Sequence, residues 1–101
     1  MIYRGEFANW NDVQNQFSMS EPEPEDVIIA SYDIDSFQGS AFVVYRNGEN
    51  YYTVSGEHCS CYGLEEQWEP EVYTKELLIS SLEKSKYLDN EEKELLQILK
   101  A

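Results

Sequence analysis

The sequence predicts an α+β fold, with a three-stranded antiparallel sheet on which one N-terminal helix and two C-terminal helices pack. Runs rich in β-branched and aromatic residues occupy the middle of the chain, at 27–34, 41–46 and 51–55. Asn47-Gly48 separates the second run from the third and is typical of a two-residue hairpin turn. Apolar residues at three- and four-residue spacing flank this region on both sides, as in amphipathic helices.

The first 20 residues are expected to form a helical segment. Trp10, Val13 and Phe17 would make one apolar stripe, and Asn9 or Asn11 would cap the first turn. Residues 21–26 follow as an acidic linker, because two prolines remove backbone donors and the like charges repel one another.

The three central runs form a β-meander in this interpretation. The first strand would place four apolar side chains on one face, namely Ile28, Ala30, Tyr32 and Ile34. Residues 35–39 supply the turn to the second strand. Counting outward from Asn47-Gly48 pairs Arg46 with Glu49, Val44 with Tyr51 and Val43 with Tyr52.

The chain is expected to end in two helices over residues 74–101. Thr74 is the expected cap of the first helix, and Asp89 with Glu92 resembles a capping box for the second. Their leucines are Leu77, Leu78, Leu82, Leu95, Leu96 and Leu99. A three-stranded sheet needs one face covered, and these leucine stripes are the expected cover. The 101 residues would form a single domain, in which residues 27–71 hold the meander and a loop rich in His, Cys and Trp.

The charge of the chain is strongly negative, at −13 for 101 residues. Residues 1–74 carry 14 Asp and Glu against two arginines, whereas residues 75–101 carry six acids against five lysines. Such a field repels phosphate backbones, which argues against direct nucleic-acid binding and favours basic protein partners. No apolar run is long enough to span a membrane, and two cysteines without an export signal indicate a cytoplasmic protein.

The segment 57–71 concentrates the reactive and bulky residues of the chain. Its characteristic residues are His58, Cys59, Cys61, Tyr62, Gly63, Leu64, Gln67, Trp68 and Pro70. The favoured interpretation is a folded structural or binding loop, in which Tyr62, Leu64 and Trp68 pack against the sheet. We assign no catalytic residue and no cofactor.

Two chemical alternatives involve His58, Cys59 and Cys61. Zinc usually binds cysteine pairs separated by two or more residues, so the one-residue gap is less suited, and no second Cys/His group completes a site. Thiol chemistry is the other alternative, either with His58 as base for a cysteine or through a disulfide between Cys59 and Cys61. The close spacing would strain that disulfide.

The string SGEHCSCYGLEEQWEPE, residues 55–71, resembles a segment of small uncharacterised proteins from tailed bacteriophages and prophages. In that family a hairpin of the form SAFVVYRNGENYYTVSG precedes the HCSCYGLE-x-QWEPE segment. The resemblance covers about Val27 to Glu71, with Glu57 a minor departure where a small polar residue is expected. It implies a phage origin and the cytoplasm of a bacterial host, and it implies no particular activity.

These observations favour a non-enzymatic binding protein or inhibitor, whose partner is a host protein with a basic, nucleic-acid-binding surface. Its carboxylates would stand in for phosphates, as in a nucleic-acid mimic. The candidate partner-binding residues are Glu21, Glu23, Glu25, Asp26, Asp33, Asp35, Glu65, Glu66, Glu69 and Glu71.

Two alternatives to this function remain. The first is a metal- or thiol-dependent protein that uses His58, Cys59 and Cys61. The second is a self-associating structural or assembly accessory, because tyrosine is favoured at interfaces and an exposed strand edge can pair with another chain. The tyrosines concerned are Tyr45, Tyr51, Tyr52, Tyr62 and Tyr73. A homodimer is therefore possible.

Overall fold

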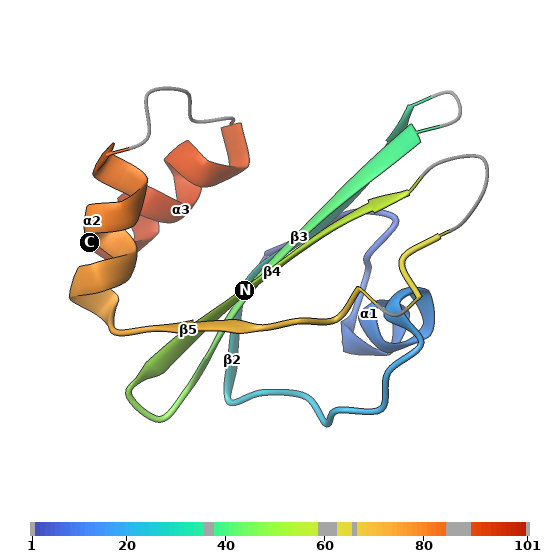
Figure 1. Ribbon diagram of the computed structural model, residues 1–101, viewed down its shortest axis with the longest axis horizontal. Helices are drawn as coiled ribbons and strands as arrows, with labels where there is room; N and C mark the ends of the chain where they lie inside the picture. The colour runs from blue at the N-terminus through green and yellow to red at the C-terminus, as the bar shows by residue number, and fades with distance from the viewer. Residues whose placement is uncertain (1, 36–37, 59–62, 66, 85–89, 101) are drawn as a thin grey trace.

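The computed structural model describes residues 2–35, 38–58, 63–65, 67–84 and 90–100. The elements follow in the order β1 (Ile2–Gly5), α1 (Trp10–Phe17), β2 (Asp26–Asp35), β3 (Gln38–Asn47), β4 (Asn50–His58), β5 (Glu71–Tyr73), α2 (Lys75–Lys84) and α3 (Asn90–Lys100). The strands form one sheet in the order β1-β2-β3-β4-β5. Figure 1 shows this sheet nearly edge-on, with α1 on one side and α2 and α3 on the other.

The α+β class and the three helices are confirmed, but the expected three-stranded antiparallel sheet is wrong. The sheet has five strands and is mixed, because β1 runs parallel to β2 while the other pairs are antiparallel. The two additional strands have only four and three residues, which is too short for a recognisable alternation in the sequence. Parallel neighbours need a crossover connection, and α1 lies in the connection from β1 to β2.

Gly5 ends β1 at a point where a side chain has no room. Its φ is +64°, and a Cβ there would lie 2.0 Å from the carbonyl oxygen of Tyr32. The next amide, that of Glu6, donates a hydrogen bond of 2.8 Å to the same carbonyl oxygen. Glycine therefore lets the chain leave the sheet while remaining against β2.

The β3–β4 hairpin is confirmed, but its register differs from the expected one by two residues. Asn47 pairs with Asn50, Arg46 with Tyr51 and Tyr45 with Tyr52, so the two turn residues are Gly48 and Glu49. Gly48 has φ +63° at the first central position, where a type II′ turn requires a positive value. Because side chains alternate with period two, this shift leaves every residue on its expected face.

An irregularity in β2 overturns the expected face of its side chains. The register against β3 shifts between Val27 and Ile29. As a result Ile28 and Ile29 pack on the side of α2 and α3, whereas Ala30 and Tyr32 pack on the other side. The fourth residue of the expected stripe, Ile34, is largely exposed.

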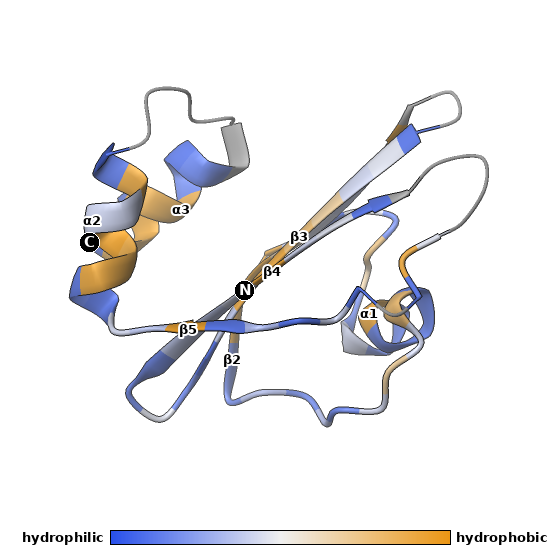
Figure 2. Ribbon diagram, viewed as in Figure 1, coloured by the Kyte–Doolittle hydropathy of each residue, from blue (hydrophilic) through white to orange (hydrophobic). Residues whose placement is uncertain are grey.

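Both faces of the sheet are apolar, so the expectation that only one face needs cover is wrong. On one face a core forms around α1 from Phe7, Trp10, Val13, Phe17, Val27, Ala30, Tyr32, Ala41, Val43, Tyr45, Val54 and Leu64. On the other face a second core forms under α2 and α3 from Ile28, Ile29, Val44, Leu78, Leu82, Leu95 and Leu99. Figure 2 shows the hydrophobic colouring in the middle of the strands and on α2 and α3.

The helix boundaries follow the expected capping residues where the structure describes them. The Asn9 side chain accepts a hydrogen bond from the amide of Asp12 and caps α1, and the Thr74 hydroxyl accepts one from the amide of Leu77 at the start of α2. Helix α1 ends at Phe17, and Ser18 caps it in the left-handed conformation, before the acidic linker begins. Leu77 is exposed rather than part of the leucine stripe, and Asp89 lies outside the described residues. Within the described ranges, no helix is long and apolar enough to cross a membrane.

The second core predicts unequal effects of two substitutions in α3. Leu95 is fully buried, whereas Ile98 is 39% exposed. Leu95→Ala should lower the free energy of unfolding by about 2–5 kcal/mol, because it removes apolar contacts and leaves a cavity. Ile98→Ala, in the same helix, should lower it by less than about 1 kcal/mol. Urea denaturation followed by tryptophan fluorescence measures both, and equal losses would contradict the packing of α3 on the sheet.

Candidate functional site

The acidic linker, residues 21–26, is fixed to the rest of the fold through its backbone. The carbonyl oxygen of Glu21 accepts hydrogen bonds from Trp10 Nε1 at 2.9 Å and from Gln14 Nε2 at 2.7 Å. At the other end, the amide of Glu25 donates to Asn47 Oδ1 at 2.9 Å. Pro24 is buried between these anchors. The side chains of Glu21, Glu23 and Glu25 are exposed, so this segment presents carboxylates from a backbone held in place.

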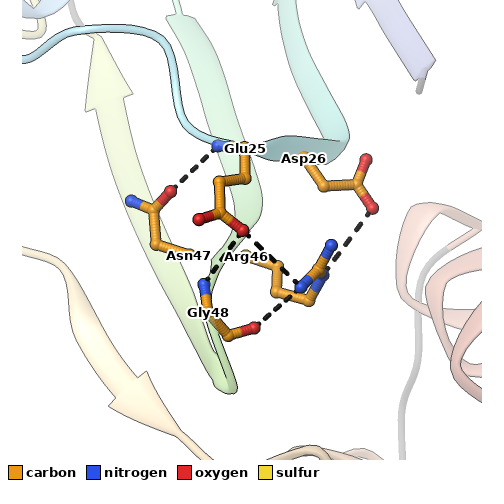
Figure 3. Close-up of polar contacts among 5 residues, drawn as sticks. All are labelled: Glu25, Asp26, Arg46, Asn47 and Gly48. Atoms are coloured by element: carbon orange, nitrogen blue, oxygen red, sulfur yellow. Dashed lines mark hydrogen bonds and ion pairs between the residues drawn. The ribbon is translucent and has the colours of Figure 1, made fainter.

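Figure 3 shows how the end of the linker meets the β3–β4 hairpin around Arg46. The guanidinium lies 3.9 Å from carboxylate oxygens of both Glu25 and Asp26, and it donates a hydrogen bond of 2.7 Å to the Gly48 carbonyl. The Gly48 amide donates to Glu25 Oε2 at 3.3 Å. Glu25 and Asp26 therefore fix the linker to the hairpin. Such partly exposed ion pairs contribute little stability individually.

The structure does not gather all ten candidate acidic residues in one place. Asp33 is seven residues from Asp26 along β2, which corresponds to about 23 Å at the usual rise of a strand. Glu65 and Glu69 lie in the connection from β4 to β5, and the Glu71 carboxylate accepts a hydrogen bond from the Tyr73 hydroxyl at 2.9 Å. The side chain of Asp35 and the whole of Glu66 lie outside the described residues.

Gln67 fixes the described part of the His/Cys/Trp loop to the sheet. Its Oε1 accepts a hydrogen bond from the Glu57 amide, and its Nε2 donates to the Glu57 carbonyl, both at 2.8 Å. Nε2 also donates to the Gly63 carbonyl at 2.7 Å. Strand β5 pairs with β4 only as far as Thr53, the partner of Glu71. Beyond that point, the Gln67 carboxamide takes the place of a paired strand. The sequence marked Gln67 as part of the motif but not this role, because glutamine has no distinctive signal for strand-edge pairing.

Leu64 and Trp68 pack against the sheet, as the sequence predicts, and they do so on the face that carries α1. Leu64 is fully buried in the first core, and the ring of Trp68 stacks on Tyr45 with centroids 6.0 Å apart and an angle of 4°. Trp68 also meets Trp10 and Phe17 edge-on, at 5.8 and 5.1 Å. Such aromatic contacts add to the stabilisation from buried area. The loop is therefore joined to α1 and to β3 at once.

The remaining motif residues are only partly described. His58 is the last residue of β4 and pairs with Gly39, but its side chain lies outside the described residues, as do Cys59, Cys61 and Tyr62 entirely. Pro70 is exposed just before β5. No three His, Cys, Asp or Glu side chains within the described ranges are placed to hold a metal ion. The metal and thiol alternatives stay predictions.

The self-association alternative also stays a prediction, and the fold indicates where it would act. Val72 on the outermost strand, β5, and Leu77 on the adjoining α2 are each 60% exposed. Exposed apolar residues beside an unpaired strand edge are a feature of surfaces that pair with other chains.

Comparisons of the chain with models of known protein families, with curated proteins and with solved structures gave no match.

Replacing Gln67 by glutamate tests the attachment of the loop. Gln67→Glu keeps the size of the side chain but removes the donors to the Glu57 and Gly63 carbonyls, so the free energy of unfolding should fall by about 1–3 kcal/mol. Exchange of the Glu57 amide with deuterium should accelerate as well. Gln16→Glu makes the same chemical change at an exposed site of α1 and should change stability by less than about 0.5 kcal/mol. If the two variants are equally stable, Gln67 does not hold the loop.

The buried aromatic cluster predicts a loss of stability at high pH. Burial, with the negative charge of Glu21 and the neighbouring Tyr52 adding to it, raises the pKa of Tyr45 from 10.0 to about 12. The unfolded chain ionises near the lower value while the folded chain keeps the proton, so the stability due to Tyr45 is complete below pH 10 and is lost towards pH 12. Tyr45→Phe should therefore lose less stability than the wild type between pH 9.5 and 11.5. Urea denaturation across this interval measures the difference, and parallel pH curves would contradict it.

Proposed function

We propose that this chain is a small acidic phage protein that acts as a non-enzymatic binding protein or inhibitor. Its partner would be a host protein with a basic, nucleic-acid-binding surface. The observation that supports this best is the acidic linker, whose backbone is anchored at both ends while Glu21, Glu23 and Glu25 are exposed to solvent.

The distribution of charge supports the proposal. Arg4 and Arg46 are the only arginines or lysines before Lys75. Arg4 pairs with Glu94, and Arg46 lies between Glu25 and Asp26. Both cations are therefore engaged within the fold. Within the described part of the chain, the carboxylates of Glu21, Glu23 and Glu69 take part in no ion pair. These charges remain available to a basic partner.

The anchoring of the linker matters for affinity. A disordered acidic segment would lose conformational entropy on binding, and this loss reduces the affinity of its contacts. Here the hydrogen bonds to Trp10, Gln14 and Asn47 have already fixed the backbone before any partner arrives. Binding then costs mainly the ordering of the glutamate side chains.

The mechanism would be occlusion aided by electrostatic attraction. The net charge of −13 accelerates encounters with a basic surface, and added salt weakens this attraction. The bound protein then covers the groove that the partner uses for nucleic acid.

The proposal predicts that binding depends on particular carboxylates rather than on net charge alone. The triple variant Glu21→Gln, Glu23→Gln and Glu69→Gln should lose most of the capture of nucleic-acid-binding proteins from bacterial lysate at low salt. The triple variant Glu6→Gln, Glu49→Gln and Glu76→Gln changes the net charge equally at other exposed sites and should retain it. Mass spectrometry of the proteins captured by each variant provides the measurement.

A captured protein then has to pass a functional test. The wild-type protein and the second triple variant should block its binding to DNA or RNA. The first triple variant should leave that binding intact. If the wild type recovers no nucleic-acid-binding protein beyond those that the first variant recovers, the proposal is wrong.

A further inference from the structure

On the face that carries α2 and α3, the strands β2, β3 and β4 continue beyond the helices (Figure 1). Three rows of side chains cross this face in register. They are Ile29–Val44–Thr53, then Ser31–Phe42–Ser55, then Asp33–Ser40–Glu57. The first row lies by the helices, with Ile29 and Val44 fully buried. Along the strands the face therefore changes from apolar residues to hydroxyls around an aromatic ring, and then to carboxylates.

The two polar rows line an open groove, with Glu92 of α3 contributing at one side. The groove has a volume of about 260 Å³. Pockets for small molecules usually enclose about 300–1,000 Å³, so this one suits a single long side chain better than a whole metabolite.

The floor of the groove offers both an apolar and a polar contact. Phe42 is half-buried and packs against the second core. Beside it Ser31, only 3% exposed, also lines the groove. A serine hydroxyl can donate or accept a hydrogen bond, so the floor suits a ligand with both an apolar and a polar part.

The mouth of the groove is negative. Asp33 and Glu57 lie two strands apart, about 10 Å at the usual strand spacing, with Ser40 between them. Both are exposed, and no ion pair of the described residues involves either. Arg4, which pairs in register with Ser31 from β1, is already engaged with Glu94. The charge of this mouth therefore favours a basic ligand.

A metal ion does not match this arrangement. A bound Ca²⁺ or Mg²⁺ needs several oxygens within about 2.0–2.6 Å, and no three acidic, His or Cys side chains in the described ranges are placed to provide them. A planar organic cation that lies on Phe42 can instead reach both carboxylates.

We propose that this groove binds an arginine side chain of a partner protein. The guanidinium stacks on Phe42 and donates hydrogen bonds to the Asp33 and Glu57 carboxylates, whose longer side chains reach toward it from either side. Arginine fits better than lysine because its planar group stacks on aromatic rings and has five donors, whereas an ammonium is compact and strongly hydrated. The inference rests on the proposed function, since it gives the basic partner a specific contact residue.

A titration with a short peptide tests the groove separately from the acidic linker. The probe is acetyl-Gly-Arg-Gly-amide, and its neutral control replaces arginine by citrulline. In nitrogen–proton correlation spectra, the amides of Ser31, Ser40, Ser55 and Gly56 should shift saturably with the arginine peptide and not with the citrulline peptide. The double variant Asp33→Asn and Glu57→Gln should weaken binding roughly tenfold, because it removes two ion pairs. Glu49→Gln with Glu76→Gln makes the same charge change at exposed sites outside both the groove and the linker, and should leave the affinity unchanged.

A second variant separates stacking from simple charge attraction. Phe42→Leu keeps an apolar floor, and it should weaken binding of the arginine peptide several-fold more than that of its lysine analogue. Groove amides that do not shift saturably would overturn the inference, as would equal affinities for the arginine and citrulline peptides. A lysine peptide that binds wild type as tightly as the arginine peptide would overturn the choice of arginine. Because the probe is a tripeptide, failure here leaves the result of the lysate experiment unaffected, and the reverse also holds.

Discussion

Strand β3 is apolar on both of its faces, and the rest of the structure depends on covering both. Val43 and Tyr45 point to one side and Val44 to the other, and all three are buried. A strand of this kind cannot face water on either side without exposing large apolar side chains. The chain meets this constraint by placing its N-terminal helix on one face and its C-terminal helices on the other. Segments from both ends of the sequence are therefore needed to cover the two faces of one sheet.

The parts of the fold that could be predicted are those specified by local sequence. Asn9 and Thr74 cap the expected helices because capping depends on residues within one turn. Strands β1 and β5 could not be predicted, because they are short and exist only by pairing with β2 and β4. The irregularity near Ile28 was equally hidden, because the faces of a strand are assigned from its sequence by assuming strict alternation.

The candidate site was predictable in composition but not in arrangement. The sequence identifies the acidic residues and the Trp68 loop, and it gives the face of each β3 and β4 residue even with the hairpin register wrong. It cannot show that Asp33 and Glu57 lie in one row across Ser40, since that row depends on the pairing of three strands. The net charge of the sequence therefore predicts a negative surface, but it does not predict how the carboxylates are grouped into separate sites.

The carboxamide of Gln67 has a consequence for how this chain behaves in a crowded solution. It occupies the Glu57 backbone amide and carbonyl in the way that a neighbouring strand would. Exposed strand edges are the points at which sheet proteins aggregate, and natural proteins protect them with short strands, bulges or covering loops. Here β5 covers the first part of the β4 edge, and a single side chain covers part of the remainder. One glutamine thus occupies backbone groups of Glu57 with which a strand of another chain could otherwise pair, so this side chain helps to protect the edge against misassembly.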